Sequence, residues 1–362
     1  MKILLLEPFY VSSHKYWADR IKRFSKHEIN LLTLPGKHWK WRMHGAAITM
    51  ADMVNQWEGD YDLILASDMM DLSVFKCLLK SQKPIYLYFH ENQLTYPWSK
   101  TDPDPQLKRD HHYGWINYTS CLVADKIIFN SHYNRSSFFS AIEDLVKRMP
   151  DFNQIDLGSL KDKSSVLPIG IEIDGEINKD KRNPPTILWN HRWEYDKNPE
   201  LFFNSLFKLD EEGINFKLIV CGENYDKSPQ IFDEARYRLK SKIIHFGYAK
   251  DVSSYKDLLA LADIYPVTSN QDFFGISVLE AIAAGAEPLL PYKLAYPEHF
   301  TQPEFDSIFY KNDTDYYALL KKLVLKKNKE TLPCQHIRRK YPWRKVIKLY
   351  DHFFEQILDS KS

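Results

Sequence analysis

The stretch SNQDFFGISVLEAIAAG, residues 269–285, lies between two short apolar runs, Ile264–Val267 and Glu287–Leu290. Short apolar runs bounded by polar residues and glycine predict buried strands, and the apolar positions of Val278–Ala284 predict a helix between them. A strand, a helix and a second strand in this order form the repeating unit of a parallel sheet. This stretch therefore predicts an α/β fold.

The same alternation extends along the rest of the chain. Before residue 172, the predicted strands are Ile3–Leu6, Ile29–Leu32, Leu63–Ala66, Ile85–Phe89, Ile127–Phe129 and one within Ser164–Ile171, and the predicted helices are Asp52–Trp57, Leu72–Leu79, Tyr113–Leu122 and Arg135–Leu145. After residue 185, the further predicted strands are Thr186–Trp189, Phe216–Cys221 and Ile243–Phe246, and the further predicted helices are Leu201–Leu209, Ile231–Leu239, Val252–Leu261 and Trp343–Leu358. The polar stretch 172–185 between the two sets contains NKDKRNPP, whose charges and paired prolines resist regular structure. We expect a first domain at 1–178, a second at 179–340 and a terminal helical segment at 341–362, with ligands at the carboxyl ends of both sheets.

The bulk composition limits the classes of function. A length of 362 residues suggests about two domains, and 44% apolar residues are sufficient for two cores. The net charge of +1 excludes a protein that binds nucleic acid through its overall field, although the stretch from Lys15 to Arg42 holds eight basic residues against two acidic ones. A local anionic partner is therefore compatible with the sequence.

The cysteines and the apolar runs indicate the compartment. The four cysteines are far apart and form no CxxC pair, which argues against a zinc site or a disulfide framework and is typical of a reducing compartment. The N-terminal apolar run is too short for a signal peptide, and no run approaches the ~20 residues that a membrane span needs. We expect a soluble, cytoplasmic protein with no membrane partner.

Two clusters in the second half carry chemistry. Arg192 and Lys197, in WNHRWEYDKNP (189–199), follow a predicted strand and could together hold a diphosphate. Taken alone, this motif favours two solvated surface cations. Gly275 precedes a predicted helix start, where backbone N–H groups favour phosphate. Asp272, before that start, can accept hydrogen bonds from sugar hydroxyls, and Glu280, one turn into the helix, can accept from both hydroxyls of a ribose. The two clusters together favour a nucleotide-sugar site over an ordinary loop.

These clusters resemble those of retaining glycosyltransferases of family 4, which have the GT-B fold of two facing Rossmann-like domains with a terminal helix that crosses back to the first. The glycine-bearing turns CGEN (221–224) and FGY (246–248) and the terminal YPWRKVIKLYDHFFEQI also fit. One departure is Asp272, where the group usually has Glu. The resemblance implies a metal-independent transfer with no cofactor, catalytic roles for His90, Arg192, Lys197 and Asp272, and donor contacts from Arg192, Lys197, Gly222, Phe274, Gly275, Ile276 and Glu280.

The first half carries aromatic and histidine clusters. LPGKHWKWRMHGAA (34–47) places Trp39, Trp41, Arg42 and His44 in a loop-like stretch, where indoles and cations could stack on bases or sugars and bind phosphates, or could simply anchor a loop. YFHENQLTYP (88–97) follows a strand with His90, Glu91 and Asn92, and Asn130 closes another strand. A structural histidine is the alternative interpretation of His90.

These segments resemble the tRNA-queuosine mannosyltransferase family. The matching elements are EPFY…SHK (7–15), LP…W.WR (34–42), FHENQL.YP (89–97) and CLVAD…FNS (121–131), and Val11-Ser12 stand where the family often has a glycine pair. The resemblance implies transfer of mannose from GDP-mannose to queuosine in the anticodon of aspartate tRNA. It also implies acceptor contacts from Ser13, His14, Trp39, Trp41, Arg42, Glu91, Asn92 and Asn130.

Other functions stay open or are disfavoured. DPD (102–104) and DYD (60–62) resemble the acidic pair of a metal-dependent transferase, but a match of three residues is weak and no supporting pattern surrounds either. No G-x-G-x-x-G follows the first strand, so a nicotinamide enzyme is disfavoured. A glycan, lipid or small-molecule acceptor would suit the donor half equally, and a non-catalytic tRNA-binding protein on a transferase scaffold is the alternative of another class.

Overall fold

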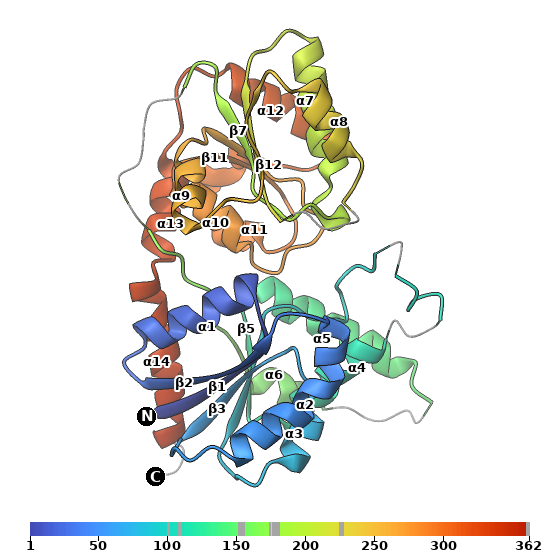
Figure 1. The fold of residues 1–362 in the computed structure, drawn as a ribbon, viewed down its shortest axis with the longest axis vertical. Helices are drawn as coiled ribbons and strands as arrows, with labels where there is room; N and C mark the ends of the chain where they lie inside the picture. The colour runs from blue at the N-terminus through green and yellow to red at the C-terminus, as the bar shows by residue number, and fades with distance from the viewer. Residues whose placement is uncertain are drawn as a thin grey trace. The chain divides into compact units, whose positions relative to one another are not determined.

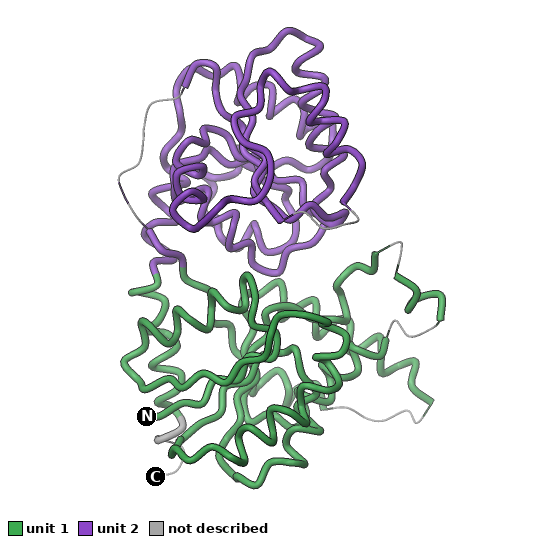
Figure 2. Tube along the Cα trace, viewed as in Figure 1, with its two compact units in different colours: residues 1–170, 343–362 green, residues 171–342 purple. Residues whose placement is uncertain are grey.

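The computed structural model describes residues 1–99, 102–107, 111–150, 156–173, 175, 182–223 and 228–359. The chain divides into two compact units, one formed by Met1–Gly170 with the segment from Trp343 onward, the other by Ile171–Pro342 (Figure 2). The linker that the sequence predicts at 172–185 falls partly on residues 174 and 176–181, which lie outside the described residues. Each unit is described by itself below.

The first unit is built on a six-stranded sheet in the order β2-β1-β3-β4-β5-β6, and every strand pair is parallel. The strands are β1 (Lys2–Tyr10), β2 (Glu28–Pro35), β3 (Leu63–Ser67), β4 (Ile85–Phe89), β5 (Lys126–Phe129) and β6 (Ser164–Val166). β3 and β4 are buried along their whole length, because helices cover both faces of a parallel sheet.

The helices of this unit form two layers (Figure 1). α2 (Trp39–Asn55), α3 (Leu72–Leu78) and α4 (His112–Val123) pack side by side on one face, and α1 (Ser12–Phe24) packs with the C-terminal α14 (Trp343–Asp359) on the other. The remaining helices are α5 (His132–Lys147) and α6 (Leu157–Asp162). The C-terminal helix is held by Tyr350, whose hydroxyl accepts from Trp17 Nε1 at 3.2 Å and donates to Tyr88 Oη at 3.0 Å.

The second unit repeats this architecture with a six-stranded parallel sheet in the order β12-β11-β10-β7-β8-β9. Its strands are β7 (Thr186–Trp189), β8 (Lys217–Cys221), β9 (Ile243–Gly247), β10 (Ile264–Pro266), β11 (Glu287–Pro291) and β12 (Phe309–Tyr310). Its α-helices are α7 (Pro199–Glu211), α8 (Ile231–Arg238), α9 (Val252–Ala260), α10 (Ile276–Ala283), α11 (Tyr296–His299), α12 (Asp313–Leu325) and α13 (Leu332–Lys340), with 3₁₀ turns at Tyr195–Lys197 and Pro303–Ile308. Two parallel sheets with crossover helices confirm the predicted α/β class.

The predicted strands agree with the structure to within a few residues at their ends, except that the short β12 is not predicted. The loop predicted around Trp39–His44 is wrong, because α2 begins at Trp39. α1, α12 and α13 were also not predicted. The apolar pattern of α2 is obscured because Trp41 and Ile48 point to solvent with 63% and 61% of their surface exposed. Within the described part of the chain, no helix combines the length and the apolar character that a membrane crossing requires.

Candidate active site

The predicted site residues of the second unit follow the carboxyl ends of its strands. Arg192 and Lys197 follow β7, Gly222 follows β8, and the loop with Asp272 follows β10 and leads into α10. Parallel strands bring these loops to one edge of the sheet, where ligands bind in open α/β folds.

Lys197 and Asp272 are brought together at this edge. The Lys197 side chain is buried, and its ammonium lies 3.8 Å from Asp272 Oδ2 and 3.2 Å from Asp196 Oδ2 while it donates to the Gln271 carbonyl at 2.7 Å. Burial alone would lower the pKa of Lys197, but the charges of Asp272 and Asp196 outweigh it and raise the pKa above its ordinary value. The lysine is therefore a fixed cation at neutral pH, and it is suited to hold a phosphate oxygen.

Asp272 and the start of α10 form the second part of this edge. Tyr296 Oη donates to Asp272 Oδ2 at 3.0 Å and fixes the carboxylate. Gly275 caps α10 with φ of 84° and ψ of 52°, a left-handed conformation that glycine adopts without strain. The first backbone N–H groups of a helix have no intrahelical acceptor, so this start can bind an anion.

Glu280 lies one turn further along α10. Its Oε2 accepts from Tyr255 Oη at 3.2 Å. Asn190 donates through Nδ2 to Tyr255 Oη and to the Ser277 carbonyl, both at 3.1 Å, and so ties the end of β7 to the helix that carries Glu280. The carboxylate is only partly buried, which leaves it accessible to a ligand hydroxyl.

The remaining predicted donor residues have different surroundings. Arg192 has a side chain 42% exposed, and its Nη2 lies 3.1 Å from Glu194 Oε2. A Cβ on Gly222 would lie 2.0 Å from the His191 carbonyl oxygen, so only glycine allows these two loops to approach. Phe274 is buried, with its ring centroid 5.0 Å from that of His299, and Ile276 is the half-exposed first residue of α10.

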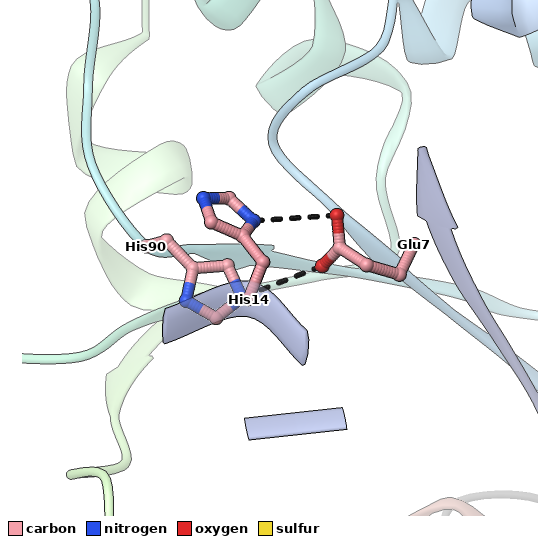
Figure 3. Close-up of side chains that lie close together, drawn as sticks. All are labelled: Glu7, His14 and His90. Atoms are coloured by element: carbon pink, nitrogen blue, oxygen red, sulfur yellow. Dashed lines mark hydrogen bonds and ion pairs between the residues drawn. The ribbon is translucent and has the colours of Figure 1, made fainter. Parts of the chain in front are cut away.

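In the first unit, Glu7, His14 and His90 form a buried cluster (Figure 3). Glu7 Oε1 lies 3.2 Å from His14 Nδ1, and Glu7 Oε2 lies 3.6 Å from His90 Nε2. The same Oε1 accepts from Phe9 N at 3.0 Å and from Ser67 Oγ at 2.9 Å. The two imidazoles are 4.0 Å apart between centroids. The structure thus brings the predicted residues His14 and His90 together through a carboxylate that sequence reasoning did not assign to the site.

The charges in this cluster are unequal. Burial would raise the pKa of Glu7, but His14 and His90 outweigh burial and hold it well below its ordinary value. Burial would lower the pKa of His14, but the Glu7 carboxylate raises it to about 9. Burial and the charge of His14 lower the pKa of His90 to about 4. At neutral pH the cluster is a Glu7–His14 ion pair beside a neutral His90.

Asp68 is a second functional candidate that sequence reasoning missed. Its Oδ1 accepts from the His90 backbone N–H at 2.9 Å, and burial raises its pKa to about 8. Glu7 lies in EPFY, a segment noted for its resemblance, and Asp68 lies in LILASDMMDL (63–72). An acid at the carboxyl end of a buried strand was the available signal.

Among the residues that the structure describes, two groups of side chains resemble metal sites. One ligand atom from each of Glu7, His14 and His90 lies within 4.8 Å of the others. However, Glu7 Oε1 already accepts three hydrogen bonds and His14 is protonated, so this donor set fits an ion pair better than a metal. In the DPD segment, Lys40 forms ion pairs with both Asp102, at 2.8 Å, and Asp104, which neutralises these acids.

Two residues predicted to contact the acceptor have their side-chain polar atoms bonded inside the protein. Asn92 is fully buried; its Nδ2 donates to Asn134 Oδ1 at 2.8 Å and its Oδ1 accepts from Thr95 N at 3.0 Å. Asn130 donates through Nδ2 to the His90 carbonyl at 2.7 Å, and its Oδ1 accepts from Asn134 Nδ2 at 3.0 Å. Through these internal bonds both residues hold the loop that carries His90.

The other predicted acceptor residues differ in accessibility. Ser13 and Trp41 are exposed, whereas Trp39 is half-buried against Tyr113, 5.0 Å away between ring centroids. The Arg42 guanidinium donates to the Pro35 carbonyl, and Glu91 Oε1 accepts from Gln93 Nε2 at 2.7 Å.

The departure at Val11-Ser12 has a structural counterpart. Ser12 has φ of 45°, in the left-handed region that favours glycine. A Cβ on Gly36, the residue after β2, would lie 2.3 Å from Val11 Cβ. The side chain of Val11 therefore fits because residue 36 is a glycine.

Comparison with solved structures identifies the fold. A sucrose-phosphate synthase from Thermosynechococcus elongatus superposes with a TM-score of 0.72 at 11% identity, over 99% of this chain and 100% of that chain. HepE from Anabaena, in complex with UDP, superposes with a TM-score of 0.64 at 12% identity, over 99% of this chain and 100% of that chain. The N-terminal domain of Candida albicans trehalose-6-phosphate phosphatase superposes with a TM-score of 0.68 at 13% identity, over 98% of this chain and 96% of that chain. At these identities the likeness shows the fold alone, which is GT-B.

Sequence comparison identifies the family. The model described as tRNA-queuosine alpha-mannosyltransferase N-terminal matches residues 2–171, and the model of glycosyl transferases group 1 matches residues 171–331. A tRNA-queuosine alpha-mannosyltransferase from Drosophila melanogaster is 34% identical over 312 residues, which cover 82% of this chain and 81% of that protein. The chain is therefore a glycosyltransferase and belongs to the tRNA-queuosine alpha-mannosyltransferase family.

Proposed function

We propose that this enzyme transfers mannose from GDP-mannose to queuosine in the anticodon of aspartate tRNA, with retention at the anomeric carbon. The observation that carries the proposal is the buried Lys197–Asp272 pair beside the start of α10, which also bears Glu280. This arrangement offers a fixed cation and a helix start to a diphosphate, and carboxylates to sugar hydroxyls. Family membership supports queuosine as the acceptor.

The proposed reaction forms one bond and breaks one. The acceptor hydroxyl oxygen bonds to the anomeric carbon on the face that the leaving diphosphate vacates, and the bond from that carbon to the phosphate oxygen breaks. The hydroxyl proton passes to an oxygen of the leaving diphosphate. Arg192, Lys197 and the start of α10 stabilise the charge that develops there.

The other residues bind and orient the substrates. Asp272 and the neutral imidazole of His90 orient the hexose, and Glu280 holds the ribose. On the acceptor side, Ser13, His14, Trp39, Trp41 and Arg42 meet the modified nucleoside. The basic residues between Lys15 and Arg42 attract the RNA backbone.

We also propose that transfer requires no metal ion and no cofactor. Lys197 supplies the fixed positive charge that a divalent cation would otherwise supply to the diphosphate. Treatment with EDTA is therefore expected to leave kcat unchanged in an assay of GDP release. Loss of activity with EDTA, restored by added Mg²⁺ or Mn²⁺, would overturn the metal-free mechanism.

We place the reaction in the cytoplasm. The cysteines at 77, 121, 221 and 334 are free thiols, and three of them are buried. Free thiols without disulfides are typical of a reducing compartment.

Replacing Glu280 with glutamine is expected to weaken binding of the donor about 10- to 150-fold, because a charge-assisted hydrogen bond to a ribose hydroxyl contributes about 1.5–3 kcal/mol. Calorimetric titration with GDP measures the effect. Tyr255→Phe is the matched control, since it removes the phenol that donates to Glu280 but keeps the carboxylate. Equal affinity of Glu280→Gln and wild type for GDP would remove Glu280 from the donor site.

Nucleoside mass spectrometry tests the function as a whole. Queuosine-bearing aspartate tRNA is incubated with the purified enzyme and GDP-mannose, digested, and compared with a sample that lacks enzyme. A queuosine peak shifted by one hexose would establish donor, acceptor and reaction together. If the queuosine peak does not shift while the enzyme still hydrolyses or binds the donor, the proposed acceptor is wrong. Binding of tRNA without any turnover would favour the non-catalytic alternative.

A further inference from the structure

A pocket of about 510 Å³ lies within the first unit and has no role in the mechanism above. Its walls include His44 of α2, Asp104, and His112, Tyr113 and Trp115 at the start of α4. The volume lies in the range of sites that bind small organic groups, about 300–1,000 Å³.

Flat rings dominate the walls of this pocket. The imidazoles of His44 and His112 are 4.7 Å apart between centroids, and His44 lies 5.6 Å from the ring of Tyr113. Trp115 is 38% exposed. Trp41, one helical turn before His44 on α2, is 63% exposed. Rings that remain accessible in this way are suited to stack on another planar group.

The pocket carries little charge of its own. The carboxylate of Asp104 is ion-paired with Lys40. Burial, and then repulsion from His112, lower the pKa of His44 below its ordinary value, so its imidazole is neutral at neutral pH. A pocket walled by rings, whose carboxylate is already ion-paired, is suited to a flat heterocycle.

An aromatic layer joins this pocket to the Glu7–His14–His90 cluster. Tyr113 packs against Trp39 and Trp98, with centroid separations of 5.0 and 6.2 Å. Phe9 packs on the same apolar group and lies 5.8 Å from the ring of His14. Contacting aromatic side chains within this unit therefore link the pocket to the cluster.

We propose that this pocket binds an unpaired nucleobase of the RNA acceptor, adjacent in the strand to the nucleoside that receives the sugar. The base stacks on Trp115, and the imidazoles of His44 and His112 hydrogen-bond to its edge. Proteins that read single-stranded RNA commonly stack splayed bases on aromatic side chains in this way. The inference rests on the proposed function only in taking RNA as the acceptor.

Binding of a short RNA hairpin that carries the aspartate anticodon loop tests this proposal without requiring catalysis. Trp115→Ala is expected to raise the Kd of the hairpin about 5- to 150-fold, the effect of losing one stacked base. The slope of log Kd against log salt should stay that of wild type, because no phosphate contact is lost. Trp115→Phe should restore most of the affinity, since it keeps a ring.

Leu122→Ala is the matched control, because Leu122 lies on the same helix, is 48% exposed and does not line the pocket. It should bind the hairpin as wild type does, and a blunt RNA duplex should not distinguish Trp115→Ala from wild type. An unchanged Kd for Trp115→Ala, a changed salt slope, or an equal loss on the duplex would overturn the proposal. A selective loss on the hairpin in an enzyme that transfers no mannose would support the pocket and refute the proposed donor reaction, so the two failures are distinguishable.

Discussion

Replacing Lys197 with alanine is expected to lower kcat about 100- to 1,000-fold, the range measured when one preorganised donor to a developing negative charge is removed. The Lys197 ammonium is buried and fixed by Asp196, Asp272 and the Gln271 carbonyl, so it needs no rearrangement to stabilise the departing diphosphate. Release of GDP under saturating donor measures the effect. Thermal stability should also fall, because two carboxylates lose their counter-charge.

A second buried lysine, Lys329, provides a control that distinguishes a loss of catalysis from a loss of stability. Lys329 has a side chain only 1% exposed, and its ammonium lies 3.3 Å from Asp263 Oδ1. Asp263 precedes β10, at the opposite end of that strand from the loop with Asp272. Lys329→Ala should therefore lower the melting temperature to a similar degree but leave kcat unchanged. Near-normal kcat in Lys197→Ala, or equal losses of kcat in both variants, would refute the assignment of Lys197 to the donor site.

Replacing Glu7 with glutamine is expected to lower the free energy of unfolding by about 3–5 kcal/mol, because the variant removes one partner of the buried Glu7–His14 ion pair. Acceptor turnover should fall with it, since the same carboxylate lies against His90. Denaturant titration at fixed pH measures the loss of stability. Ser67→Ala is the matched control, because it removes one neutral donor from the same Glu7 Oε1 and should cost only about 1 kcal/mol at every pH.

The pH dependence of this loss identifies its cause. The pKa of His14 is raised from 6.5 to about 9 in the folded protein, so the His14–Glu7 pair contributes its full stability below pH 6.5 and loses it as the pH rises through about 9. In Glu7→Gln, burial without the carboxylate should lower the pKa of His14 instead. The difference in stability between wild type and variant should therefore shrink as the pH rises from 6.5 toward 9. Asp68 titrates with a pKa of about 8 in wild type, and a Ser67→Ala series over the same pH range controls for its contribution. A difference that does not change with pH would show that Glu7 acts by packing alone.

The sequence by itself determined the α/β class, the alternation of strands and helices, and the donor-side motif. Short apolar runs bounded by glycine and polar residues are local signals, and the strand-end rule then places Lys197, Asp272 and Glu280 at one edge of a parallel sheet. The structure confirms that Lys197 and Asp272 meet. The helical start of α2 at Trp39 escaped this reasoning, because exposed Trp41 and Ile48 blur the apolar period on which it depends.

Only the tertiary structure decided which polar groups are available and which are charged. Glu7 and Ser67 meet because β1 and β3 are neighbours in the sheet. The two strands are far apart in sequence, and no local pattern pairs them. The internal bond of the Asn92 side chain depends on Asn134 of α5, 42 residues further along the chain. The opposite pKa shifts of His14 and His90 arise from burial beside a shared carboxylate. Residue type fixes what a side chain can do, but burial and long-range neighbours fix its charge and its free atoms, and these exist only in the folded chain.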